Sequence, residues 1–172
     1  IATRSADSSK VCVPVGQEQR EYHRGRIRFL KEAQDVARFQ SEPNIVSIYD
    51  YLEENDTAYM VMEYLHGCTL KQYIREHGGR LDTDHILHIC LSVLDALAVV
   101  HKAGMIHRDI SPENIFICED LTVKLIDFGA AKQVYLEGEQ TMSVVLKPGY
   151  APPEQYAKKD KQGPWTDIYA LG

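Results

Sequence analysis

Apolar residues recur at helical spacing in two long stretches of the chain. Over 22–39 they form one stripe while charged side chains face the other way, so the pattern predicts an amphipathic helix of about four turns that ends before Pro43. Over 83–102 the apolar stripe is continuous and Gly104 follows it, which predicts a helix whose apolar side belongs to the core. A shorter helix is expected over 70–77, before a pair of glycines.

Runs rich in β-branched and aromatic residues predict two pairs of strands. The runs 45–52 and 57–64 are joined by the polar tetrapeptide 53–56, which favours an antiparallel hairpin. Two shorter apolar runs, 115–118 and 123–126, are separated by a few mostly charged residues. Helices and strands are therefore both expected in one domain.

Two stretches lack a clear period. The first twenty residues are polar and support at most a short strand over 10–15. From 133 to 161 the chain contains several glycines and prolines and few periodic signals. Because so long a structureless stretch inside a compact domain is usually functional, this segment is a candidate part of the site.

The composition is that of a folded globular domain. Of 172 residues, 44% are hydrophobic and 26% are charged, which excludes a disordered tail. A net charge of -6 argues against a nucleic-acid-binding surface over the whole domain. Four widely spaced cysteines without a C-x-x-C pair favour reduced thiols in the cytoplasm over a zinc site or a disulfide framework. No apolar run approaches the length of about 18 residues that a membrane span needs.

Polar motifs stand at the ends of the predicted elements. The sequence His-Arg-Asp at 107–109 follows the long helix, and Asn114 comes five residues after its aspartate. Asp-Phe-Gly at 127–129 follows the last short strand. Further along, Pro-Pro-Glu at 152–154 comes near the end of the aperiodic stretch, and Trp-Thr-Asp at 165–167 begins a helix. In this order and spacing, the motifs resemble those of protein kinase catalytic domains.

The resemblance implies an α+β fold with two lobes. Residues 1–62 would form a partial small lobe, 63–67 the hinge, and 68–172 a partial, mainly helical large lobe. Within the family, the stretches 107–115 and 146–156 are similar to bacterial-type, or eukaryotic-like, serine/threonine kinases. The implied activity is transfer of the γ-phosphoryl group of ATP to a serine or threonine hydroxyl, with Mg²⁺.

The resemblance also implies a role for individual residues. Phosphoryl transfer needs positioning and charge neutralisation more than covalent chemistry. Asp109 would accept the proton of the attacking hydroxyl, while Asn114 and Asp127 would hold Mg²⁺. The residues that would bind ATP are Glu32 on the first helix, Met62 behind the adenine, Glu63 and Leu65 through hinge backbone groups, and Phe116 under the ring.

Other positions would be structural or regulatory. Arg108 would pair with a phosphorylated activation segment, in which Thr141 and Ser143 are the candidate phosphorylation sites. A stack of four side chains would couple the first helix to the metal-binding loop, with ordinary core packing as the alternative: Val36, Ile48, His107 and Phe128. The positions that match structural residues of the family are His107, Arg108, Phe128, Glu154 and Asp167.

Two internal departures from the family pattern indicate an exchange. Two residues after the catalytic aspartate, where serine/threonine kinases usually have lysine, this chain has Ser111. Lys147 stands before Pro-Gly-Tyr, where the family has threonine. We expect the ammonium of Lys147 to reach back to Asp109 and the transferring phosphate, with Ser111 leaving it room. The alternative is a solvated lysine beside a space-filling serine, because lysine side chains are mostly exposed.

Two parts of the family's nucleotide site are missing from the sequence. No G-x-G-x-x-G and no V-A-x-K occurs, and Lys10 is interpreted as a loop lysine because its neighbours lack a strand pattern. Without these parts the phosphates have no lid and Glu32 has no lysine partner. The chain is therefore expected to be a kinase domain cut at both ends, inactive by itself and weak in nucleotide binding.

A protein substrate is the expected partner, and nucleic acid is not. The domain is expected in the cytoplasm, any membrane anchor would lie in segments outside these residues, and a homodimer would allow autophosphorylation. Two alternatives stay open. Intact Asp109, Asn114 and Asp127 count against a pseudokinase or scaffold binding module. The parts of a peptide platform, Phe-Gly at 128–129 and Pro-Glu at 153–154, count against a small-molecule kinase of the aminoglycoside or choline type.

Overall fold

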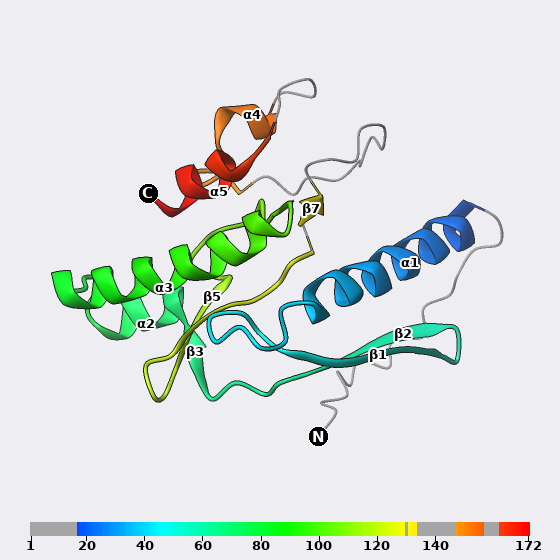
Figure 1. The fold of residues 1–172 in the computed structure, drawn as a ribbon, viewed down its shortest axis with the longest axis horizontal. Coiled ribbons are helices and arrows are strands. Elements are labelled where there is room, and N and C mark those ends of the chain that lie inside the picture. The colour runs from blue at the N-terminus through cyan, green and yellow to red at the C-terminus, as the bar shows by residue number, and fades with distance from the viewer. Residues whose placement is uncertain (1–16, 130, 134–146, 157–161) are drawn as a thin grey trace.

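The computed structural model of the chain describes residues 17–129, 131–133, 147–156 and 162–172. In Figure 1 a long helix lies beside a two-stranded hairpin, and the other helices lie around short strands. The helices are α1 (Gln17–Ala37), α2 (Leu70–Glu76), α3 (Thr83–Lys102), α4 (Pro153–Tyr156) and α5 (Pro164–Leu171). The strands are β1 (Ile48–Glu54), β2 (Thr57–Met62), β3 (Gly67–Thr69), β4 (Met105–Ile106), β5 (Ile115–Cys118), β6 (Val123–Leu125) and β7 (Lys132–Gln133).

Helix α1 packs against the β1–β2 hairpin, as Figure 1 shows. Ala33 and Val36 are buried on the predicted apolar stripe. The helix begins at Gln17, earlier than the predicted start at 22. The prediction started too late because the first turn of the helix is polar and shows no apolar period. Periodicity therefore identifies only the part of the helix that faces the core. The short strand predicted over 10–15 lies outside the described residues.

Strands β1 and β2 pair antiparallel as predicted, but their turn is shorter than the polar tetrapeptide suggested. Glu54 already pairs with Thr57, so only Asn55 and Asp56 form the turn. Their φ angles of +51° and +56° fit the left-handed geometry of a two-residue type I′ turn, which Asn and Asp tolerate. Strand β1 is exposed beyond its first residue, so polar side chains fit within it.

The first residues of the predicted strand 45–52 contact a different strand. Ile45 forms a parallel bridge with Leu125 of β6. Val46 N donates to Leu125 O at 3.0 Å, and Leu125 N donates to Asn44 O at 2.8 Å. The apolar pattern at the start of this run therefore reflects burial against β6, and β1 begins after it.

Helix α3 has the predicted bounds, 83–102. Asp82 caps its start by accepting from His85 N at 2.9 Å, and Gly104 follows its end with a φ of +76°. By length and composition the helix could span a membrane, which a count of consecutive apolar residues did not reveal. Its packing on β4 and β6 favours a core helix instead. Its buried stripe consists of Ile89, Val93, Ala96, Leu97 and Val100.

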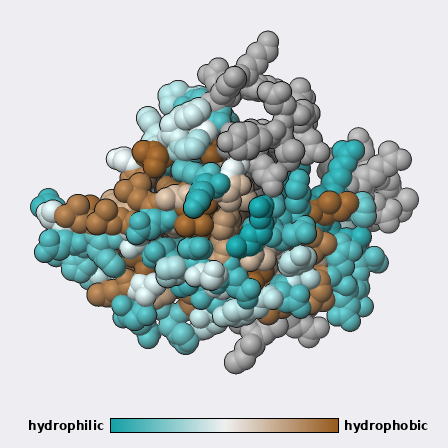
Figure 2. Space-filling model, in the orientation of Figure 1, coloured by the Kyte–Doolittle hydropathy of each residue, from teal (hydrophilic) through white to brown (hydrophobic). Residues whose placement is uncertain are grey.

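Strands β3, β5 and β6 form an antiparallel sheet in that order. The runs 115–118 and 123–126 form the paired strands β5 and β6, with β6 one residue shorter than its run. Helix α2 follows β3 directly, with Thr69 as its N-cap. Figure 2 shows apolar residues exposed over α3 next to a largely hydrophilic surface. The exposed apolar residues of α3 include Ile86, Leu87, Leu91 and Leu94.

Candidate active site

One buried carboxylate anchors the loop that carries the His-Arg-Asp motif. Asp167 is fully buried in α5, which begins at Pro164, just before the Trp-Thr-Asp motif that was expected to begin it. Its carboxylate accepts from the backbone N of His107 at 2.9 Å and of Arg108 at 2.7 Å. The same group lies 2.7 Å from Nε2 of His101 in α3. The loop, α3 and α5 are therefore joined at a single point, and Arg108 adopts a φ of +70° there.

Asn114 orients the carboxylate of Asp109. Its Nδ2 donates to Asp109 Oδ2 at 2.7 Å and to Asp109 O at 2.9 Å. Because the amide nitrogen faces Asp109, the amide oxygen is the end that can serve as a ligand. The backbone continues the connection, since Ile126 N donates to Asn114 O at 3.0 Å. Asp127 follows immediately, so the two candidate metal-binding side chains come from adjoining segments.

Lys147 also contacts the carboxylate of Asp109. Its Nζ donates to Ser111 Oγ at 2.7 Å and lies 3.3 Å from Asp109 Oδ1 and 3.4 Å from Oδ2. Ser111 and Lys147, the two positions of the predicted exchange, are thus brought together beside Asp109. Because the side chain of Lys147 is only 29% exposed, it is not a fully solvated lysine. Its role in phosphoryl transfer stays a prediction.

The Asp-Phe-Gly segment turns a carboxylate outward and an aromatic ring inward. Asp127 has a φ of +59° and accepts from Gly129 N at 3.1 Å, while its side chain is exposed. Phe128 is buried, with its ring 4.6 Å from that of His107 and 6.5 Å from that of Phe39. Burial lowers the pKa of His107, so this ring is neutral. Val36 and Ile48, the other predicted members of the stack, are buried in the same core cluster as Phe128.

Comparisons with known proteins agree with this geometry. The family model described as "Protein kinase domain" matches residues 2–172. The chain belongs to the protein kinase family. It is 42% identical to the serine/threonine-protein kinase PrkC of Bacillus subtilis and 39% identical to a probable serine/threonine-protein kinase PknB of Lactococcus lactis, in each case over 146 residues and 84% of the chain.

A solved structure supports the same fold. The kinase chain is similar to the apo form of PpkA-294, with a TM-score of 0.75 and 35% sequence identity over 91% of this chain and 55% of that one. The α+β kinase fold with two lobes that the sequence predicted is therefore confirmed. The chain forms part of the small lobe and part of the mainly helical large lobe. The kinase chain spans 22% and 23% of the lengths of PrkC and PknB. The lobe and hinge boundaries at 62/63 and 67/68 stay predictions.

Glu32 lies beside the Asp-Phe-Gly segment. Its carboxylate oxygens come within 3.6 to 3.7 Å of the position that a Cβ would occupy on Gly129. Burial, with a smaller contribution from the charge of Asp127, raises the pKa of Glu32 from 4.5 to about 7. In the part of the chain that the structure describes, Glu32 has no ion pair. The raised pKa is what a carboxylate without a cationic partner is expected to show.

Replacing Glu32 by glutamine should stabilise the fold above pH 7. Between pH 4.5 and 7 the unfolded chain loses the Glu32 proton while the folded chain keeps it, so native stability falls as the pH rises through this window. With allowance for partial exposure, Glu32→Gln should remove a penalty of about 1–2 kcal/mol at pH 7.5 and little at pH 4.5. Urea unfolding at both pH values measures the difference. An equal effect of the substitution at both would contradict the assignment.

The residues predicted to bind adenine surround the connection from β2 to β3. Met62 is 43% exposed at the end of β2, while Leu65 and Phe116 are partly buried. The backbone N of Glu63 donates to Ser47 O at 2.9 Å, so this donor is already used within the protein, and adenine binding by these residues stays a prediction.

Sequence reasoning missed the pairing of the Glu63 side chain. Its carboxylate accepts from Ser47 N at 2.8 Å and forms an ion pair with Lys124 of β6 at 2.7 Å. Both side chains of the pair are mostly buried, so the connection is fixed at its first residue. No local pattern in the sequence reveals a pair that lies on separate strands.

Arg108 presents a half-buried guanidinium. Desolvation lowers its pKa, and among the described residues its Nε has no hydrogen-bond partner. Its backbone carbonyl accepts from Gln155 Nε2 of α4 at 2.9 Å, a contact that the sequence did not predict. Glu154 accepts from Thr166 Oγ1 at 3.0 Å, which links α4 to α5. Thr141 and Ser143 lie outside the described residues.

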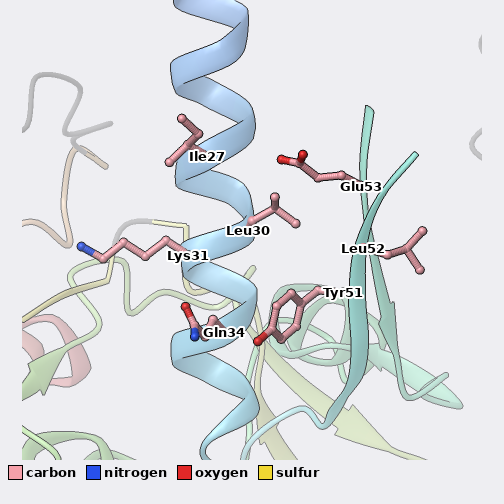
Figure 3. A pocket seen from close by; sticks show the side chains of 7 residues that line it. All are labelled: Ile27, Leu30, Lys31, Gln34, Tyr51, Leu52 and Glu53. Atoms are coloured by element: carbon pink, nitrogen blue, oxygen red, sulfur yellow. The ribbon is translucent and has the colours of Figure 1, made fainter. Parts of the chain in front are cut away.

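A separate groove lies between α1 and β1. Figure 3 shows Tyr51 and Glu53 extending from β1 toward α1, whereas Leu52 points the other way. The groove shares no lining residue with the Asp109 cluster. Its lining consists of Ile27, Leu30, Lys31, Gln34, Tyr51, Leu52 and Glu53.

The donor set fits Mg²⁺ bound together with phosphates. The described residues contain no group of three His, Cys, Asp or Glu side chains that could hold a metal alone. Asn114 and Asp127 supply one amide and one carboxylate, and Mg²⁺ is commonly held by one or two such side chains plus substrate oxygens. The outward carboxylate of Asp127 and the fixed amide of Asn114 are consistent with that arrangement.

Proposed function

We propose that the protein containing this chain is a serine/threonine protein kinase that uses ATP and Mg²⁺. The observation that carries the proposal is the environment of Asp109, whose carboxylate is held between Nδ2 of Asn114 and Nζ of Lys147 on a loop anchored by buried Asp167. The names of the similar proteins PrkC and PknB support the same activity. A protein substrate is proposed on the same ground.

In this proposal Asp109 accepts the proton of a serine or threonine hydroxyl. Asn114 holds the Asp109 carboxylate in one orientation, and its amide oxygen together with Asp127 holds Mg²⁺. The ammonium of Lys147, beside Asp109, stabilises negative charge at the transferring group. Mg²⁺ and ATP, when bound, supply the phosphoryl group and neutralise its charge. Met62, Glu63, Leu65 and Phe116 are proposed to contact the adenine, and Glu32 to serve the phosphate side.

Incubation of the full-length protein with γ-labelled ATP and a mixture of protein substrates tests the activity. We expect label on serine or threonine, and loss of labelling with EDTA. The 172-residue chain, which contains no G-x-G-x-x-G or V-A-x-K, should transfer nothing and bind Mg²⁺-ATP weakly by calorimetry. Tight binding by this chain would contradict the second expectation. Label found only on small molecules would favour a small-molecule kinase of the aminoglycoside or choline type. The absence of any label would favour a pseudokinase.

Substitution of Lys147 tests the exchange with Ser111. In the full-length protein, Lys147→Ala should lower kcat by about 10- to 100-fold, because a cation close to the transferring phosphate is removed. Steady-state kinetics measures the effect. The matched control is Lys102→Ala, which replaces an exposed lysine in the last turn of α3. Undiminished transfer by Lys147→Ala would show that this lysine has no part in the reaction.

Regulation by phosphorylation is part of the proposal. The half-buried guanidinium of Arg108 has no ion pair among the described residues, which suits a phosphate on Thr141 or Ser143. Autophosphorylation would need two copies to meet, so a transient homodimer is proposed. The domain is proposed to act in the cytoplasm, with any membrane anchor supplied by segments outside these residues.

A further inference from the structure

The ammonium of Lys147 has a second carboxylate neighbour besides Asp109. Oε2 of Glu113 lies 3.7 Å from Lys147 Nζ, while Asp109 Oδ1 lies 3.3 Å away. Ser111 Oγ accepts from the same Nζ at 2.7 Å. Two anionic groups and one hydroxyl thus surround an ammonium that has three donors. Of these partners, the sequence predicted only Asp109, since Ser111 was expected merely to leave room for the ammonium.

Glu113 is itself held from the other side. Its Oε1 accepts from Lys71 Nζ of α2 at 2.6 Å, so the two carboxylate oxygens serve two different lysines. The backbone is joined at the same place, because Lys71 N donates to Pro112 O at 2.9 Å. The hydrogen bond from Lys71 holds the pKa of Glu113 below its ordinary value, and the charge of Lys147 acts in the same direction. Glu113 therefore stays ionised next to Lys147.

We propose that Glu113 is a positioning residue that holds the ammonium of Lys147 beside Asp109, with Lys71 fixing the orientation of the Glu113 carboxylate. The inference rests on the proposed function, because it assigns Glu113 to the support of Lys147 in phosphoryl transfer. Lys147 comes from a segment far along the chain from the loop. An ammonium on four rotatable bonds needs several partners to stay in one place. Asp109, Ser111 and Glu113 all hold it from the loop, and Lys71 of α2 fixes the carboxylate of Glu113 in turn.

A double-mutant cycle in the full-length protein tests this proposal. Glu113→Gln should lower kcat about tenfold, with the KM for ATP changed less than about twofold, as expected for coupled residues in contact. In a Lys147→Ala background the same substitution should have no further effect. Glu119→Gln changes an exposed glutamate directly after β5; it is the matched control and should retain wild-type kcat. Independent, multiplicative losses in the double variant would overturn the proposal.

The reactivity of the Lys147 amine gives a readout that does not depend on catalysis. Brief acetylation with acetic anhydride, followed by peptide mass spectrometry, measures how well the amine is held. Glu113→Gln should raise the acetylation rate of Lys147 severalfold and leave that of Lys102 unchanged. If the full-length protein transfers no phosphate, the proposed function fails, and the acetylation rate alone decides whether Glu113 holds Lys147. An unchanged rate at Lys147 would overturn the positioning role in either case.

Discussion

Full-length protein that carries Asp109→Asn should show a kcat about 10²–10⁴-fold lower than wild type, the usual contribution of a positioned general base. The amide oxygen of the new side chain can still accept from Asn114 Nδ2, and the carboxyl-sized group still fits beside Lys147. The substitution therefore removes proton acceptance with little change in shape. Steady-state transfer of labelled phosphate to a protein substrate, at saturating ATP, is the measurement.

Two controls make this result specific. Asp95→Asn changes an exposed aspartate of α3 and should leave kcat unchanged. The melting temperature of the Asp109→Asn protein should lie close to that of wild type, because the substitution is made at a partly exposed loop position. Retention of a tenth or more of the wild-type kcat would exclude Asp109 as the proton acceptor.

Asp167→Ala should give the largest loss of stability of any single substitution in the site. The carboxylate of Asp167 accepts from two backbone N–H groups and pairs with His101, and it is fully buried. Each buried donor left without a partner costs about 1–3 kcal/mol, so the two backbone groups together give about 2–6 kcal/mol. Chemical denaturation followed by circular dichroism measures this change in the free energy of unfolding.

A graded series separates hydrogen bonding from charge at this position. Asp167→Asn keeps one acceptor oxygen for a loop N–H group, so its loss should be smaller than that of Asp167→Ala. Both variants should lose activity, because the backbone of His107 and Arg108 is released next to Asp109. A loss below 1 kcal/mol for Asp167→Ala would mean that water replaces the carboxylate at this place.

The motif residues and the main helices could be predicted because their signals are local. The apolar stripe over 83–102 gives the bounds of α3, since burial of one helix face requires that spacing. Lys147 could be linked to Asp109 from sequence alone because two departures from a family pattern, at Ser111 and at Lys147, complement each other. The structure places Lys147 Nζ within 3.4 Å of both Asp109 and Ser111.

The contacts that could not be predicted join elements distant in the sequence. Two ion pairs are examples, Glu63 with Lys124 and Lys71 with Glu113. In the sequence these are charged residues like those of any solvent-exposed surface, and only the tertiary fold decides which of them meet. The turn at Asn55 and Asp56 was misjudged for a related reason. Polar residues were assigned to the loop, whereas an exposed strand accepts them equally well.

The anchor at Asp167 has a consequence for the synthesis of the protein. The backbone N–H of His107 that it fixes lies 60 residues earlier in the chain. At the usual rate of translation this separation corresponds to about 3–12 s, during which α3 is complete while the loop after it has no anchor. The loop that carries His107 and Arg108 therefore reaches its final geometry only after α5 has left the ribosome.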